Sequence, residues 1–150
     1  MKKILLIGIG NTGRGDDGLG WTFAERLRED GRLDVACRYQ LQVEDADLIS
    51  RYQQVWFVDA SHEQIPGGYR CEPVRGEGHF SYTTHALHPE AVVQLCHQLY
   101  DKWPESRLLG ISGANFELGR CMSAAAAQHL ERALAYFYAR TGIQPVVKQV

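Results

Sequence analysis

Acidic and histidine side chains that could do chemistry follow separate stretches of the chain. Asp16 and Asp17 come after an apolar run near the N-terminus, Asp59 directly follows a second apolar run, and His85 lies in a later polar stretch. Carboxylates that converge without cationic partners repel one another unless a metal ion or shared protons neutralise them. An Asp, Asp, His set offers mixed oxygen and nitrogen ligands, which suit a borderline divalent metal. These residue types favour a metal site if the fold brings them together.

The elements that must position these residues follow from the hydrophobic pattern. Residues 3–9 and 55–58 are continuous apolar runs, typical of strands buried on both faces. We expect further strands over 35–41, 69–74 and 107–111, and helices over 18–29 and 45–51. A third helix is expected to begin at Pro89, and its inner face to comprise Val92, Val93, Cys96, Leu99 and Tyr100. A fourth helix is expected after Ser123, which would be its N-cap. Strands that alternate with helices predict one α/β domain over residues 1–150, a three-layer α/β/α arrangement with a mostly parallel, twisted sheet.

Ligands bind such sheets outside the carboxyl ends of the strands, which is where Asp17 and Asp59 are expected. Each acid also has a purely structural interpretation. Asp17 suits the first turn of a helix, Asp59 suits a turn at a strand end, and Asp16 suits capping of the following helix. Spacing alone does not decide between these roles and metal binding.

Other classes of site fit the same loop less well. Gly8, Gly10 and Gly13 satisfy the G-x-G-x-x-G pattern of dinucleotide-binding loops. Asp16 and Asp17, however, lie where a helix N-terminus would meet pyrophosphate, and their charges would repel it. A phosphoacceptor receiver domain needs a lysine after the last strand, where this chain has none, and no G-x-S-x-G nucleophile motif occurs.

Composition excludes several further classes. The chain has 150 residues and a net charge of −2, which argues against a nucleic-acid partner. No apolar run approaches the roughly 20 residues of a membrane helix, and the first run is too short for a signal peptide, so we expect no membrane partner. The four cysteines form no C-x-x-C pair. We therefore expect reduced thiols in a cytoplasmic, monomeric protein.

One long motif adds a family resemblance. Residues 8–20, GIGNTGRGDDGLG, resemble the opening motif G-x-G-N-x-x-x-G-D-(D or E)-G-x-G of the hydrogenase maturation endopeptidases. Residues 55–60, 83–85 and 109–123 resemble that family's second acidic strand, its histidine loop and its closing strand and helix entry. The resemblance thus spans nearly the whole chain, and it implies a fold of the phosphorylase/hydrolase-like kind.

The resemblance implies an activity as well. The family removes the C-terminal extension of a nickel–iron hydrogenase large-subunit precursor, cutting after a His or Arg once nickel is inserted and using that nickel as the recognition mark. The alternative is an accessory protein of hydrogenase assembly that binds nickel without cleaving.

The same resemblance implies which residues form the site. Asp17, Asp59 and His85 correspond to the nickel ligands, with His88 as a substitute for His85, and Gly10 and Asn11 belong to the loop that supports them. Nickel would come with the substrate, and another divalent ion would occupy the site in isolation. The ion would polarise the scissile carbonyl or lower the pKa of an attacking water.

Two features stay open at this stage. Asp16, not bound to metal, would accept the proton of the attacking water, with helix capping as its alternative role. Residues 41–46, LQVEDA, replace the Asp-Gly-Gly-Thr-type turn of many family members. We therefore expect recognition of the substrate's tail to differ in this chain.

Overall fold

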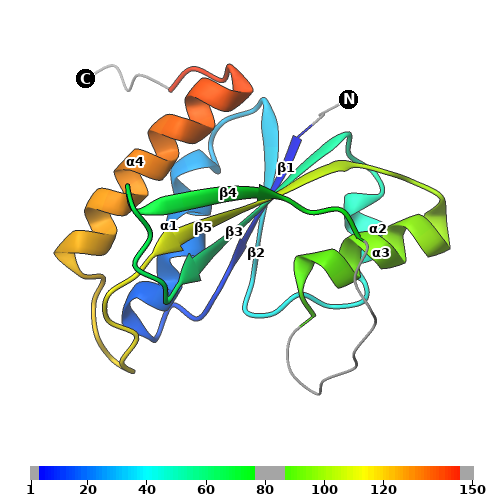
Figure 1. Ribbon diagram of the computed structural model, residues 1–150. Helices are drawn as coiled ribbons and strands as arrows, with labels where there is room; N and C mark the ends of the chain where they lie inside the picture. The colour runs from blue at the N-terminus through cyan, green and yellow to red at the C-terminus, as the bar shows by residue number, and fades with distance from the viewer. Residues whose placement is uncertain (1–3, 77–86, 146–150) are drawn as a thin grey trace.

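The strands expected from the sequence form one five-stranded sheet in the order β2-β1-β3-β5-β4 (Figure 1). The computed structural model describes residues 4–76 and 87–145. The strands are β1 (Ile4–Ile9), β2 (Leu33–Arg38), β3 (Gln54–Ser61), β4 (Tyr69–Pro73) and β5 (Glu105–Ser112). The first four in spatial order run parallel, and β4 pairs antiparallel with β5 at one edge. The expected mostly parallel sheet is confirmed.

Helices cover both faces of this sheet. They are α1 (Leu19–Leu27), which follows the short 3-10 helix η1 (Gly15–Gly18), α2 (Asp45–Ile49), α3 (Pro89–Tyr100) and α4 (Ala124–Thr141). Helices α1 and α4 lie on one face and α2 and α3 on the other, as Figure 1 shows. The three-layer α/β/α arrangement is therefore confirmed.

Alternation along the strands explains the two layers of core. Trp56 and Val58 of β3 pack with α1 and α4, whereas Val55 and Phe57 pack with α2 and α3. Successive side chains of a strand point to opposite faces, so a strand with helices on both sides must be apolar throughout. The uninterrupted apolar runs of β1 and β3 have this cause.

Close backbone approach sets α1 directly above the sheet. A Cβ atom on Gly20, in the first turn of α1, would lie 2.4 Å from the carbonyl oxygen of Val58 and 2.5 Å from that of Ile9. Only a residue without a side chain permits this contact between a helix and two neighbouring strands. The contact places the start of α1, and the acidic residues just before it, over the carboxyl ends of β1 and β3.

Two details differ from the sequence-based expectations. Asp59 lies inside β3, which runs on to Ser61, and not after it. Leu99 and Tyr100 are exposed, so their assignment to the inner face of α3 was wrong. Within α3, the buried members of the underlying core cluster are Val92, Val93 and Cys96, so the cluster extends along the helix only as far as Cys96.

The start of the last helix is as expected from the sequence, with Ser123 as its N-cap. The Ser123 hydroxyl accepts a hydrogen bond from the Ala126 amide and caps α4, and Gly142 ends the helix in the left-handed conformation. None of the helices in the described part of the chain is long and apolar enough to span a membrane.

Candidate metal and active site

Asp17 is held at the carboxyl edge of the sheet by the loop that follows β1. Its Oδ2 accepts a hydrogen bond from the backbone amide of Asn11, at 2.8 Å. Gly10 has a φ of 141°, and a Cβ atom there would lie 2.0 Å from the carbonyl oxygen of Asp17. The loop thus folds back on itself in a conformation that requires glycine, and both Gly10 and Asn11 contact Asp17.

Asp59 lies near Asp17, on the neighbouring strand β3. One carboxylate oxygen of Asp59 accepts a hydrogen bond from the Ala60 amide, at 2.8 Å. Burial is the largest of the effects that raise the pKa of Asp59 to about 7; the hydrogen bond from Ala60 opposes it, and the negative charge of Asp17 adds to it. Within the described residues, neither carboxylate forms an ion pair with a lysine or arginine. Among the residues that the structure describes, the pair therefore lacks a cationic partner.

Asp16 is turned away from this pair, into the interior. Its carboxylate is fully buried and accepts hydrogen bonds from the amides of Ala114, Asn115 and Ser123 and from the Ser123 hydroxyl. Burial alone would raise the pKa of Asp16, but these hydrogen bonds outweigh it, and the pKa lies below its ordinary value. This geometry favours a structural role over proton transfer, and the carboxylate bonds to the distant start of α4, not to the helix that follows it.

Of the two candidate histidines, His85 and His88, the structure describes only His88. His85 lies outside the described residues. His88 is exposed and precedes α3 as its N-cap residue, with no capping hydrogen bond from its side chain. In the part of the chain that is described, no three His, Cys, Asp or Glu side chains stand close enough to hold a metal ion. The structure thus does not bring His88 together with Asp17 and Asp59.

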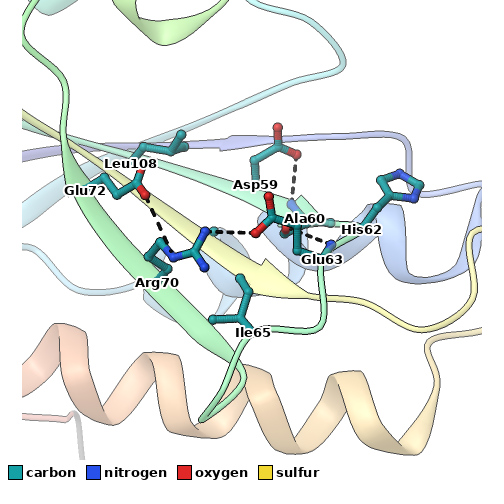
Figure 2. Close-up of a pocket in the computed structure, with 10 residues that line it drawn as sticks. Asp59, Ala60, His62, Glu63, Ile65, Arg70, Glu72 and Leu108 are labelled. Carbon is teal, nitrogen blue, oxygen red and sulfur yellow. Dashed lines mark hydrogen bonds and ion pairs between the residues drawn. The ribbon is translucent and has the colours of Figure 1, made fainter.

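A cavity of about 420 Å³ adjoins Asp59 on the sheet face that also carries α2 and α3 (Figure 2). Tyr69 and Cys71 of β4 pack on the opposite face, so the alternate residues Arg70 and Glu72 point toward the cavity. Its lining comprises Asp59, Ala60, Ser61, His62, Glu63, Ile65, Arg70, Glu72, Leu108 and Gly110.

One cation faces three carboxylates in this cavity. A guanidinium nitrogen of Arg70 lies 2.9 Å from Glu63 and another lies 3.9 Å from Glu72, and Figure 2 shows both contacts near Asp59. The cavity wall therefore carries a net negative charge. Sequence analysis did not single out these residues, because their proximity depends on the antiparallel pairing of β4 with β5.

The donor set suits part of a divalent metal site. Two carboxylates offer hard oxygen ligands. A metal ion would offset both the cost of burying the charged form of Asp59 and the repulsion between Asp59 and Asp17. Further ligands would come from a bound substrate, from water or from residues outside the described ranges. The described residues therefore offer such an ion two ligands, Asp17 and Asp59.

Solved structures supply the comparison with known proteins. No family model matches the sequence, and a search of the curated proteins finds no relative. The fold is similar to that of HycI, a NiFe hydrogenase maturation protease from Thermococcus kodakarensis KOD1, with 23% identity, a TM-score of 0.71, and coverage of 92% of this chain and 91% of that one.

Two structures from Escherichia coli agree with this similarity. The hydrogenase maturating endopeptidase HybD has 17% identity and a TM-score of 0.72, over 93% of this chain and 92% of that one. The endopeptidase HycI has 24% identity and a TM-score of 0.67, over 99% of both chains. The chain has the fold of the hydrogenase maturation proteases, and the motif by which its sequence resembles them forms the loop that carries Asp17.

Proposed function

We propose that this protein is an endopeptidase of the hydrogenase maturation family. It removes the C-terminal extension of a nickel–iron hydrogenase large-subunit precursor after nickel has been inserted, and the substrate's nickel serves as the recognition mark. The observation that carries this proposal is the Asp17–Asp59 pair at the carboxyl edge of a sheet with the fold of the known maturation proteases. The sequence motif around Asp17 supports it independently.

In this proposal Asp17 and Asp59 bind the substrate's nickel. His85 is the third ligand, an assignment that rests on the sequence resemblance. An ion held there would supply Lewis-acid chemistry: it would polarise the scissile carbonyl or lower the pKa of a water molecule. Asn11 holds the carboxylate of Asp17 in place through its amide. Asp59, with a pKa of about 7, is readily deprotonated near neutral pH when it meets a cation.

Asp16 is not needed as the proton acceptor in this proposal. A proton acceptor must reach the attacking water with a free lone pair. The carboxylate of Asp16 is buried and engaged with four donors. In this proposal its carboxylate instead stabilises the loop that carries Asp17.

The cavity beside Asp59 is the proposed place for the substrate segment next to the cleaved bond. Ile65 and Leu108 give it apolar surface, and its three carboxylates outnumber the single guanidinium of Arg70. A segment with a basic side chain complements this charge. That preference agrees with the cleavage after His or Arg that the sequence resemblance implies.

The test is a cleavage assay on a nickel-loaded precursor from the same organism. Wild-type protein should remove the C-terminal peptide, whereas Asp17→Asn and Asp59→Asn should leave the precursor intact. Asp101→Asn is the matched control, because Asp101 is an exposed aspartate at the far end of α3 in a left-handed conformation that asparagine tolerates. Equal cleavage by wild type and both site variants would refute Asp17 and Asp59 as the nickel site, and no cleavage by wild type would refute the endopeptidase assignment.

A further inference from the structure

The loop that carries Asp17 is fastened to a distant part of the chain through its neighbour, Asp16. Both carboxylate oxygens of Asp16 are used. Oδ1 accepts from the Ser123 amide at 2.7 Å, and Oδ2 accepts from the Ala114 amide at 2.6 Å, the Asn115 amide at 2.9 Å and the Ser123 hydroxyl at 2.7 Å. These donors lie 98 to 107 residues further along the chain, in the β5–α4 connection and at the N-cap of α4.

The backbone of the same loop is fastened to the same connection. The Asp16 amide donates to the Asn115 carbonyl at 2.7 Å, and the Gly119 amide donates to the Gly13 carbonyl at 2.8 Å. Gly15, with a φ of 55°, packs so closely that a Cβ atom would lie 2.5 Å from the Asn115 carbonyl oxygen. The two loops therefore fit together on both sides of Asp16.

This attachment has a consequence for the next residue. Asp16 and Asp17 are adjacent in η1, so fixing the backbone and side chain of Asp16 also limits where Asp17 can point. Among the described residues, the Asn11 amide is the one group that donates a hydrogen bond to the Asp17 side chain. A single hydrogen bond stabilises a partly exposed carboxylate only modestly, so the placement of Asp17 also depends on the backbone around it.

We infer that Asp16 is a positioning residue: its buried carboxylate latches the Asp17 loop to the β5–α4 connection and so keeps the Asp17 carboxylate facing Asp59. Only the predicted effect of Asp16 on cleavage rests on the proposed function. The latch itself is a property of the fold, and it links the metal-binding edge to the first turn of α4.

Asp16→Asn is the direct test, because it keeps the shape of the side chain and changes one acceptor into a donor. Whichever oxygen is replaced, the new amide group meets an N–H or O–H that already donates to that position. The matched control is Asp30→Asn. Asp30 is another buried carboxylate, and it pairs with Arg32 just before β2, at the amino ends of the parallel strands and so away from Asp16.

Hydrogen exchange of the Asn11 amide, which donates to Asp17, gives a readout that does not need activity. Compared at matched global stability, Asp16→Asn should speed exchange at Asn11 by about tenfold or more, whereas Asp30→Asn should leave it unchanged. Equal exchange at Asn11 in the two variants would overturn the inference.

A milder pair of variants covers the case in which Asp16→Asn does not fold. Ser123→Ala removes one donor to Asp16, together with the cap of α4, and should also speed exchange at Asn11. Ser123→Thr keeps a hydroxyl and should restore the protection. If Ser123→Ala leaves exchange at Asn11 unchanged, the latch does not hold Asp17.

Cleavage of a nickel-loaded precursor adds the functional readout. Asp16→Asn should lower kcat by about tenfold or more, with a smaller change in KM, and Asp30→Asn should lower it by less than about twofold. Equal losses of kcat in both variants would contradict a positioning role. If wild-type protein cleaves no precursor, the proposed function fails, and exchange at Asn11 still decides whether the latch exists.

Discussion

Asp17, in the short helix η1 after β1, lies close enough to Asp59 of β3 for its charge to help raise the pKa of Asp59 to about 7, together with the larger effect of burial. Two carboxylates in such a position repel each other when both are ionised. A folded protein keeps this arrangement at a cost in stability unless a cation or a shared proton relieves it. The pair is therefore the best evidence in this structure for a site that binds a positive charge.

Replacing either carboxylate by its amide should abolish cleavage and spare the fold. In Asp17→Asn and Asp59→Asn the side-chain oxygen still accepts the amide hydrogen bond of Asn11 or Ala60. We expect the loss of a metal ligand to lower kcat/KM by more than about 100-fold, with a loss of unfolding free energy no greater than about 1 kcal/mol. His85→Ala should lose activity to the same extent. Circular dichroism and urea denaturation check the fold, and full activity in all three variants would contradict the ligand assignment.

The stability of the metal-free protein should depend on pH through Asp59. Between its ordinary pKa of 3.8 and its folded-state pKa of about 7, the folded protein binds more protons at Asp59 than the unfolded chain does. The contribution of Asp59 to the unfolding free energy is therefore fully present below pH 3.8 and is lost as pH rises through about 7. Asp59→Asn should be more stable than wild type by about 1–3 kcal/mol at pH 8, relative to the same difference at pH 4.

Urea denaturation of both proteins at the two pH values, with a chelator present, measures this double difference. Because the other titrating groups are common to both proteins, their effects cancel in the comparison. The same difference between the two proteins at pH 4 and pH 8 would show that Asp59 has no raised pKa.

The glycine before Asn11 should be indispensable. In Gly10→Ala the new methyl group meets the Asp17 carbonyl oxygen, and the φ of 141° is one that alanine rarely adopts. We expect a loss of about 2–4 kcal/mol in unfolding free energy. Gly31→Ala is the control, since a Cβ atom there meets no atom within 4 Å and should change stability by less than about 1 kcal/mol. Equal stability of the two variants would mean that the loop adjusts without strain.

The acidic wall of the cavity should affect substrate binding more than the chemical step. The double variant Glu63→Gln and Glu72→Gln leaves the Arg70 guanidinium without its carboxylate partners and removes two negative charges. We expect KM for the precursor to rise by roughly fivefold with little change in kcat, as for the loss of about 1 kcal/mol of binding energy. Steady-state kinetics beside Glu29→Gln, an exposed acid on another surface, provide the check. An unchanged KM would exclude the cavity from substrate binding.

The elements of this fold could be predicted because their sequences agree with their surroundings. The apolar runs of β1 and β3 are buried on both faces, and Ser123 and Gly142 mark the ends of α4. Asp17 and Asp59 could be placed at one edge from the rule that parallel strands end together. The strand expected over residues 69–74 is β4, although its antiparallel direction was not predicted.

Other features could not be predicted, because they depend on partners that a local pattern does not contain. The donors to Asp16 include the backbone amides of Ala114 and Asn115, which have no side-chain signal. The exposure of Leu99 depends on where the core beneath α3 ends. The charge of the cavity depends on the pairing of β4 with β5, which brings Arg70 and Glu72 beside Asp59.

The most direct test of the central claim compares one precursor with and without nickel. Purified protein is mixed with a hydrogenase large-subunit precursor from the same organism in both forms, and mass spectrometry follows the loss of the C-terminal peptide. We expect that peptide to be released only from the nickel-loaded precursor. Release from both forms would contradict nickel as the recognition mark, and release from neither would contradict the endopeptidase assignment and favour a nickel-binding accessory protein.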